Sequence, residues 1–156
     1  FTHVRVGLGL HGSFDPEGPN VLGLDPPVFT LRARLAQVRT LPAGRTIGYH
    51  ATYTCARPMR IGTVAAGYAD GLPLALSNRG RVIIRGRACP VLGRVSMDYT
   101  TVSLEAVPEA APGDPVYCLG GPGPERVTVA EWAAIKGTQP YEILCAIGPR
   151  TVRRVR

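Results

Sequence analysis

Three tyrosines stand where a phenol could do chemistry, because each follows glycine or proline at the expected edge of a strand or helix. They are Tyr49, Tyr68 and Tyr141. A phenol at such a turn is exposed, and it both donates and accepts hydrogen bonds. Its ordinary pKa is about 10, so it works as a base near neutral pH only where a cation stabilises the phenolate. Neighbouring arginines could supply that cation. The alternative is that these tyrosines are amphipathic residues at the rim of the core.

The cysteines and histidines lack the spacing of a metal site or a hydrolytic triad. A loop that binds zinc carries two cysteines separated by about two to four residues, whereas the cysteines here are far apart. Three histidines occur without a G-x-S-x-G motif, which gives Ser-His-Asp catalysis little support. The four cysteines are predicted to be reduced and mostly buried: Cys55, Cys89, Cys118 and Cys145.

A glycine pattern near the N-terminus resembles a nucleotide-binding fingerprint. Gly7, Gly9 and Gly12 spell G-x-G-x-x-G. A dinucleotide site needs this pattern to open a helix, but the proline- and glycine-rich residues 13–27 cannot form one. A glycine turn after a strand can still present backbone N–H groups to a phosphate.

The net charge of +7 comes almost entirely from arginine, since Lys136 is the single lysine among 18 basic residues. Basic domains often bind nucleic acid. These arginines mostly alternate with apolar residues, however, which favours solvent-facing positions on strands. The alternating arginines are Arg32, Arg34, Arg39, Arg45, Arg57, Arg60, Arg79, Arg81, Arg85, Arg87 and Arg94.

Short strands bounded by glycine, proline or asparagine must position these groups. We expect the strands to begin at residue 28 and to continue at 45–55, 60–66, 81–85, 88–92, 98–104 and 115–119. The close pair 81–85 and 88–92 is typical of a hairpin. Many short strands at this spacing predict a β-barrel or sandwich.

Two helices are predicted near the C-terminus. Thr128 and Glu131 form a capping-box pattern, and Gly137 stands where a helix ends. A shorter helix is expected from Pro140 to just before Gly148. The tail 151–156 could add a closing strand, and residues 4–6 a short strand at the other end.

Five ordered segments closely resemble the C-terminal β-domain of alanine racemase, an enzyme that uses pyridoxal phosphate. They read GYHATYT from residue 48, GYADG from 67, GRVSMD from 93, PYE from 140 and GPRTVRR from 148. The leading VRVGLGL resembles the last strand of that family's N-terminal barrel and the turn after it. The resemblance implies a mainly β, antiparallel barrel-like domain with two short C-terminal helices, preceded by a remnant strand of a β/α barrel. Residues 1–12 would be that remnant, 13–27 a linker and 28–156 the β-domain.

The resemblance implies roles in proton transfer and substrate binding. Tyr49 matches the catalytic tyrosine, which exchanges the α-proton on one face of the substrate in the partner subunit's active site. The backbone N–H of Met97 would help to hold the substrate carboxylate. Tyr68 matches a gate residue of the substrate access corridor, with Arg94 and Asp98 lining or bracing it.

The same resemblance implies a set of cofactor contacts. Arg5 matches the arginine that faces the pyridine nitrogen, where a permanently charged guanidinium cannot give up its proton. Gly7 and Leu8 match backbone donors to the phosphate of pyridoxal 5′-phosphate. Tyr141 matches the tyrosine that bonds the same phosphate.

Three positions depart from the family pattern. The family anchors its cofactor on a barrel lysine, whereas Lys136 lies in the predicted helix and is expected to be a surface residue. Leu74 stands where the family often has an arginine, which changes the charge of the corridor. His50 replaces a common glycine beside Tyr49, and we expect its imidazole to face solvent.

The resulting hypothesis is the C-terminal part of a bacterial, cytoplasmic, homodimeric alanine racemase. This isomerase would interconvert L- and D-alanine for D-alanine biosynthesis and peptidoglycan precursors. Its partners would be the N-terminal barrel and a second subunit, with no nucleic acid, membrane or metal. The chain alone is expected to be inactive, because the anchoring lysine is missing from it. The alternatives are a non-catalytic β-barrel module for binding or dimerisation, or a racemase for another small amino acid such as serine.

Overall fold

The computed structural model describes residues 2–3, 7–11 and 29–154. Arg5, the expected strand at 4–6 and the expected linker at 13–27 lie outside the described residues. The proposed boundaries between barrel remnant, linker and β-domain therefore stay predictions.

Within residues 29–154, six strands form one antiparallel sheet in the order β6-β5-β8-β1-β4-β7. A bridge between Val91 and Val102 joins the two edges, so the sheet is a nearly closed barrel. The predicted mainly β, barrel-like fold is confirmed. The strands are β1 (Leu31–Leu41), β4 (Met59–Val64), β5 (Arg81–Ile84), β6 (Arg87–Pro90), β7 (Thr100–Ser103) and β8 (Pro115–Leu119).

Strand β1 spans the barrel and belongs to both of its halves. Its first residues pair with β8 and its last ones with β4, and the register shifts between Leu35 and Gln37. Such an irregularity bends a strand, which lets one long strand serve two directions of the sheet. Leu31 and Leu35 are buried while Arg32 and Arg34 are exposed. The predicted solvent-facing arginines are confirmed in this strand.

The hairpin β5–β6 is also confirmed. Its turn is Arg85-Gly86, and both residues have positive φ, +50° and +74°. A two-residue turn of this hand matches the twist of the strands it joins.

The expected single strand at 45–55 is wrong. The segment instead forms β2 (Thr46–Ile47), the 3-10 turn η2 (Tyr49–Ala51) and β3 (Tyr53–Thr54), a small hairpin of its own. Three residues with positive φ on either side of Tyr49 prevent a continuous strand: Gly48, His50 and Ala51 have φ values of +77°, +62° and +50°.

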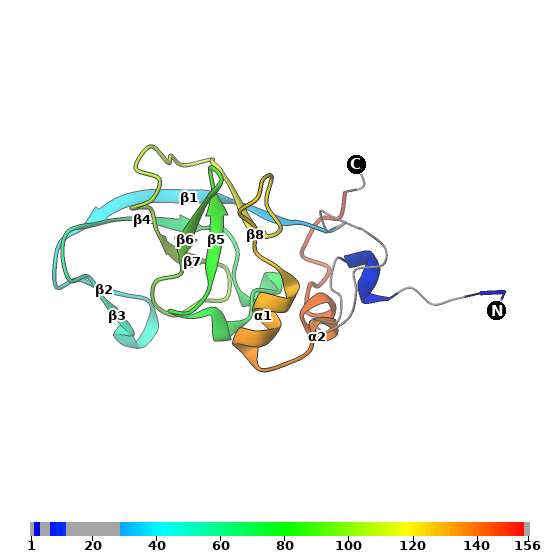
Figure 1. Ribbon diagram of the computed structural model, residues 1–156. Coiled ribbons are helices and arrows are strands. Elements are labelled where there is room, and N and C mark those ends of the chain that lie inside the picture. Colours follow the sequence, from blue (N-terminus) through cyan, green and yellow to red (C-terminus); the bar gives the residue numbers. More distant parts are fainter. Residues whose placement is uncertain (1, 4–6, 12–28, 155–156) are drawn as a thin grey trace.

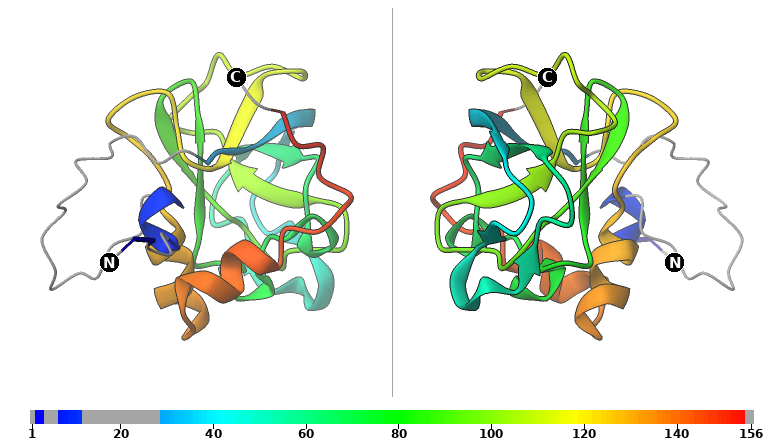
Figure 2. Two further views of the ribbon diagram at one scale, coloured as in Figure 1. Left: turned by 90° about the vertical axis from the view of Figure 1, so that its right-hand side faces the viewer. Right: turned by 90° about the vertical axis from the view of Figure 1, so that its left-hand side faces the viewer.

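Both predicted helices are present, as α1 (Val129–Lys136) and α2 (Pro140–Cys145). The Thr128 hydroxyl caps α1 by accepting from the Glu131 N–H at 3.0 Å, and Gly137 ends the helix in the left-handed conformation. The Glu131 carboxylate accepts from Arg81 on β5. The two helices lie together at one end of the barrel (Figures 1 and 2), and Trp132 is buried there.

The tail does not form a closing strand over its described residues 151–154. It folds back over the 3-10 turn η3 (Tyr68–Asp70), where the Thr151 hydroxyl donates to the Asp70 carbonyl at 3.4 Å. Arg153 donates to the Ile147 carbonyl at 3.1 Å. Side-chain bonds of this kind hold the tail as an irregular segment.

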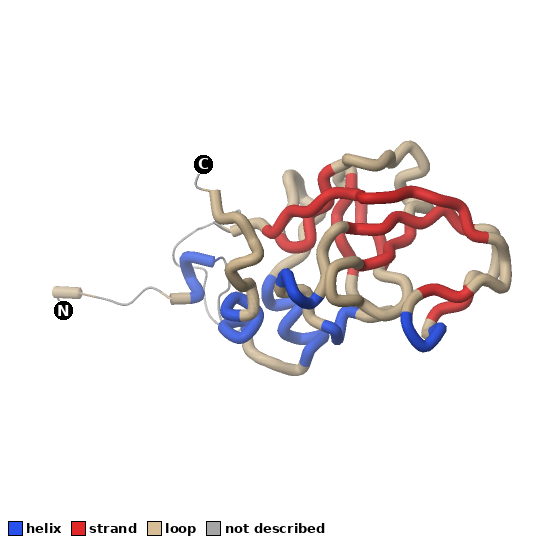
Figure 3. The backbone as a smooth tube through the Cα atoms, turned by 180° about the vertical axis from the view of Figure 1, so that it is seen from behind, coloured by secondary structure: helices blue, strands red, loops and turns tan. Residues whose placement is uncertain are grey.

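The core has a large part inside the barrel and a small part under the β2–β3 hairpin. In Figure 3 the strands lie together in one part of the molecule, and α1, α2 and the 3-10 turn η1 (Leu8–His11) gather at one end. No helix in the described part of the chain is long and apolar enough to cross a membrane.

The four cysteines are free, and Cys55, Cys89 and Cys118 are buried, as predicted. Burial raises the pKa of Cys89 to about 11 and that of Cys118 to about 12, because a thiolate loses its hydration there. These thiols therefore stay protonated and pack as small apolar groups.

Candidate functional site

Tyr49 lies on an exposed turn that is locked against the segment of Arg94. Its side chain is 70% exposed. A Cβ on Gly48, which has a φ of +77°, would lie 2.7 Å from the Arg94 backbone nitrogen. Only glycine fits this approach without moving one of the two segments.

The Arg94 segment has its own glycine in close contact with the segment that leads to Tyr49. Gly93 has a φ of +74°, and a Cβ there would lie 2.6 Å from the Ile47 carbonyl oxygen. Two glycine turns thus cross each other, one leading to Tyr49 and the other to Arg94. The side chain of Arg94, on this neighbouring segment, is exposed.

Tyr68 and Met97 are also brought together. The Tyr68 N–H donates to the Ser96 carbonyl at 2.9 Å, and the Ala69 N–H donates to the Met97 carbonyl at 3.0 Å. A Cβ on Gly67 would lie 2.2 Å from the Ser96 carbonyl oxygen, so these turns are in backbone contact. The side chains of Tyr68 and Met97 are 47% and 51% exposed.

Asp98 is held by a residue to which the sequence analysis assigned no role. The Arg150 guanidinium donates to Asp98 at 2.7 Å and forms an ion pair with Asp70 at 3.3 Å. The hydrogen bond to Asp98 and the charge of Asp70 raise the pKa of Arg150 above its ordinary value. The sequence offered a signal for this contact, because the GPRTVRR segment contains the arginine and two other motifs each contain one of the aspartates.

Gly7 and Tyr141 meet although they are far apart in the sequence. A Cβ on Gly7 would lie 3.0 Å from the Tyr141 hydroxyl oxygen, and 54% of the Tyr141 side chain is exposed. Leu8 follows at the start of η1. A bare backbone beside a phenol hydroxyl has the donors that a phosphate needs.

The Tyr49 turn and the Gly7–Tyr141 contact lie toward opposite ends of the molecule. The β2–β3 hairpin, whose turn carries Tyr49, is at the left of Figure 1, whereas α2 and η1 are at the right. Figure 3 shows the same separation from behind. The structure therefore brings Gly7 to Tyr141 and Arg94 to the turn of Tyr49, and it keeps the two pairs apart.

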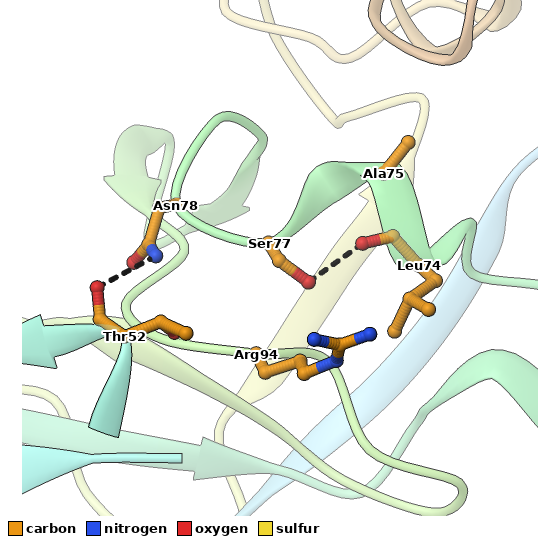
Figure 4. A pocket seen from close by; sticks show the side chains of 6 residues that line it. All are labelled: Thr52, Leu74, Ala75, Ser77, Asn78 and Arg94. Atoms are coloured by element: carbon orange, nitrogen blue, oxygen red, sulfur yellow. Dashed lines mark hydrogen bonds between the residues drawn. The ribbon is translucent and has the colours of Figure 1, made fainter. Parts of the chain in front are cut away.

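A shallow pocket of about 350 Å³ opens beside the turn that carries Tyr49 (Figure 4). Leu74, the replacement for the family's arginine, contributes an exposed apolar side chain, and Arg94 contributes a charge. The lining residues are Thr52, Leu74, Ala75, Ser77, Asn78 and Arg94.

Lys136 and His50, the other two departures from the family pattern, are exposed as predicted. Lys136 is exposed on α1 and pairs with Glu142 on α2. His50 is exposed beside Tyr49. Among the described residues, no group of three or more His, Cys, Asp or Glu side chains could hold a metal ion.

Known proteins similar to this chain are alanine racemases. The family model described as alanine racemase, C-terminal domain, matches residues 28–155. The alanine racemase of Syntrophobacter fumaroxidans is 44% identical over 153 residues, which cover 95% of this chain and 40% of that protein. The chain thus spans about two-fifths of the length of this relative.

Solved structures agree in fold. The biosynthetic alanine racemase of Pseudomonas aeruginosa matches with a TM-score of 0.83 and 40% identity, covering 95% of this chain and 40% of that one. The alanine racemase of Bartonella henselae, with covalently bound pyridoxal phosphate, matches with a TM-score of 0.71 and 32% identity, covering 78% of this chain and 33% of that one. The chain belongs to the alanine racemase C-terminal domain family.

Proposed function

We propose that this chain is the C-terminal part of an alanine racemase that uses pyridoxal phosphate and interconverts L- and D-alanine. One observation carries the proposal: the Tyr49 phenol is exposed on a turn locked to the segment of Arg94, at the end of the domain opposite Gly7 and Tyr141. A proton-transfer group must reach a substrate outside the chain's own fold, and the described residues leave 70% of Tyr49 exposed.

Tyr49 takes the α-proton from one face of the substrate, or returns it. A racemase needs an acceptor on one face and a donor on the other, so a second group must serve the opposite face. Arg94 lies on the adjoining segment, and its side chain lines the pocket beside the Tyr49 turn.

The residues around Met97 bind and admit the substrate. The Met97 N–H holds the substrate carboxylate, and Tyr68 gates the access corridor from the turn bonded to the Met97 segment. Arg94 and Asp98 line this corridor, and the ion pairs of Arg150 brace it.

Pyridoxal phosphate, when bound, supplies an electron sink that makes the α-proton removable. The Gly7–Tyr141 contact fits its phosphate, because the missing Cβ leaves the backbone beside the phenol hydroxyl. Gly7 and Leu8 donate backbone N–H groups, and Tyr141 donates its hydroxyl. Arg5, which lies outside the described residues, is assigned to the pyridine nitrogen, and the anchoring lysine would belong to the N-terminal barrel.

Because the Tyr49 and Gly7–Tyr141 ends are separated, Tyr49 serves the active site of a partner subunit in a homodimer. The cofactor contacts of the same chain serve its own barrel. In the cytoplasm of a bacterium, the product D-alanine supplies cell-wall precursors.

The test is Tyr49→Phe in the full-length enzyme. Phenylalanine keeps the ring and removes the proton carrier, so we expect turnover to fall by about 10²–10⁴-fold. Exchange of the α-proton with solvent deuterium should be lost for one enantiomer and kept for the other. Unchanged turnover in both directions would refute the role of Tyr49. Tyr99→Phe is the matched control, because Tyr99 is similarly exposed and has no proposed role.

A further inference from the structure

Asn78 lines the pocket beside the Tyr49 turn, and its side chain bonds both to the end of that turn and to the segment of Arg94. We propose that Asn78 is a positioning residue that sets the Tyr49 turn against the Arg94 segment. The inference rests on the proposed function, since it concerns the placement of the proton-transfer group.

The Asn78 amide bonds to both segments at once. Its Nδ2 donates to the Thr52 carbonyl at 3.1 Å, and Thr52 is the residue that ends the η2 turn (Figure 4). Its Oδ1 accepts from the Gly93 N–H at 2.6 Å, directly before Arg94. One planar group thereby fixes the distance between the end of the Tyr49 turn and the start of the Arg94 segment.

The neighbouring Ser77 completes the hold on Arg94. Its hydroxyl accepts from the Val95 N–H at 3.0 Å and donates to the Leu74 carbonyl at 2.6 Å. The backbone N–H groups on both sides of Arg94 are therefore bound by consecutive side chains. The Arg94 side chain is left to line the pocket.

The turn of Tyr49 depends on such outside contacts, because it has little to hold it in place by itself. None of its residues is buried, and it is flanked by strands of two residues each. His50 and Ala51 both adopt positive φ, a conformation that costs free energy in residues other than glycine. A turn of this kind keeps its conformation only where the surroundings impose it.

The residue type at position 78 fits this role. Asn78 has a φ of +56°, in the left-handed region that glycine and asparagine adopt most readily. Glycine would satisfy the backbone but supply neither hydrogen bond. Aspartate would keep the acceptor for Gly93 and place a second oxygen against the Thr52 carbonyl.

Two variants of the full-length enzyme follow from this chemistry. Asn78→Gly keeps the backbone conformation and deletes both bonds, whereas Asn78→Asp deletes only the donor to Thr52. Arg79→Ala is the matched control, because Arg79 is the next residue, is exposed and does not line the pocket.

Hydrogen exchange reports the placement without using activity. We expect the Ala51 N–H, which closes the η2 turn onto the Gly48 carbonyl, to exchange about fivefold faster in both Asn78 variants. The Gly93 N–H should exchange faster in Asn78→Gly and remain protected in Asn78→Asp. Arg79→Ala should leave both amides unchanged. Equal exchange in all three variants would overturn the proposal.

The kinetic readout separates positioning from general stability. We measure the primary isotope effect with each enantiomer of α-deuterated alanine. Both Asn78 variants should lower kcat and raise the isotope effect only for the enantiomer whose proton Tyr49 removes, as identified with Tyr49→Phe. An equal rise for both enantiomers would reduce Asn78 to a structural role and overturn the proposal.

Failure of the proposed function and failure of the positioning role give different kinetic results. If Tyr49→Phe shows no asymmetry between the enantiomers, the proposed function fails and the positioning role fails with it. If Tyr49→Phe is asymmetric and the Asn78 variants are not, only the role of Asn78 is refuted.

Discussion

At the scale of single residues, the site is assembled by glycines that let one backbone touch another. Gly48, Gly67 and Gly93 each place the missing Cβ less than 3 Å from a backbone atom of another motif. The motifs are thus joined through their main chains, and the side chains of Tyr49 and Met97 stay exposed. Glycine is the only residue that allows this approach, since any Cβ would overlap the facing backbone.

Gly67→Ala should destabilise the full-length protein by about 1–3 kcal/mol, because its Cβ would overlap the Ser96 carbonyl and cannot rotate away. Urea unfolding measures the loss. Gly123→Ala is the control, since a Cβ there meets no heavy atom within 4 Å. Equal effects of the two substitutions would show that the Gly67 approach is not needed.

At the scale of the elements, charged side chains fasten the barrel strands to what surrounds them. Arg81 joins β5 to α1 by bonding Glu131 through Nε and Nη2. Arg85, in the β5–β6 turn, forms two bonds to Asp114, just before β8. Arg150 joins the η3 turn to the Asp98 segment. The arginines that alternate along the sequence thus serve as connections between elements as well as solvent-facing positions.

The Arg85–Asp114 pair predicts a pH dependence of stability. The hydrogen bond from Arg85, with that from the Ala111 N–H, lowers the pKa of Asp114 in the folded protein. A lowered pKa stabilises the folded state above the unfolded value of about 3.9 and loses that contribution as the pH falls. Asp114→Asn should therefore flatten the loss of stability below about pH 4, measured by urea unfolding at several pH values.

Arg85→Gln is the partner control for this prediction, since it removes the same interaction from the other side. Combining the two substitutions should add little to either alone. An unchanged acid profile in both single variants would refute the coupling.

At the scale of the whole molecule, the residues of the proposed site lie at two opposite ends of the domain. The β2–β3 hairpin presents Tyr49, and α2 with η1 presents Tyr141 and Gly7 (Figure 1). The chain spans 40% of the length of one alanine racemase relative. The proposed function assigns the two ends to two different active sites, an arrangement that a symmetric dimer would provide.

Subunit mixing tests this arrangement. Tyr49→Phe enzyme is combined, after dissociation, with a variant that lacks the proposed anchoring lysine of the barrel. Each is expected to be nearly inactive, but every mixed dimer should contain one intact site. Random mixing should restore about a quarter of normal activity. Mixed dimers that form, as native mass spectrometry can show, but stay inactive would place Tyr49 in its own subunit's site.

Local rules were sufficient for several elements. The β5–β6 hairpin, the Thr128 cap and the alternation in β1 follow from interactions within a few residues, and each was predicted correctly. The turn of the hairpin is Arg85-Gly86, one residue earlier than the predicted strands 81–85 and 88–92 imply. The strands expected at 45–55 and 151–156 were predicted wrongly. Local strand propensity takes no account of contacts with segments that are distant in the sequence. Crossing glycine turns and bonds to Asp70 and Ile147 impose those conformations.

The order of residue types along the chain was enough to determine the family, the barrel-like class and the candidate residues, since motif identity survives without coordinates. Only the tertiary structure decided that Gly7 meets Tyr141, that Asn78 and Arg150 hold the motif segments, and that the turn carrying Tyr49 lies at the end of the domain opposite α2 and η1. The physical reason is that these are contacts between segments distant in sequence. Their geometry depends on how the closed sheet brings backbones together, which no local pattern encodes.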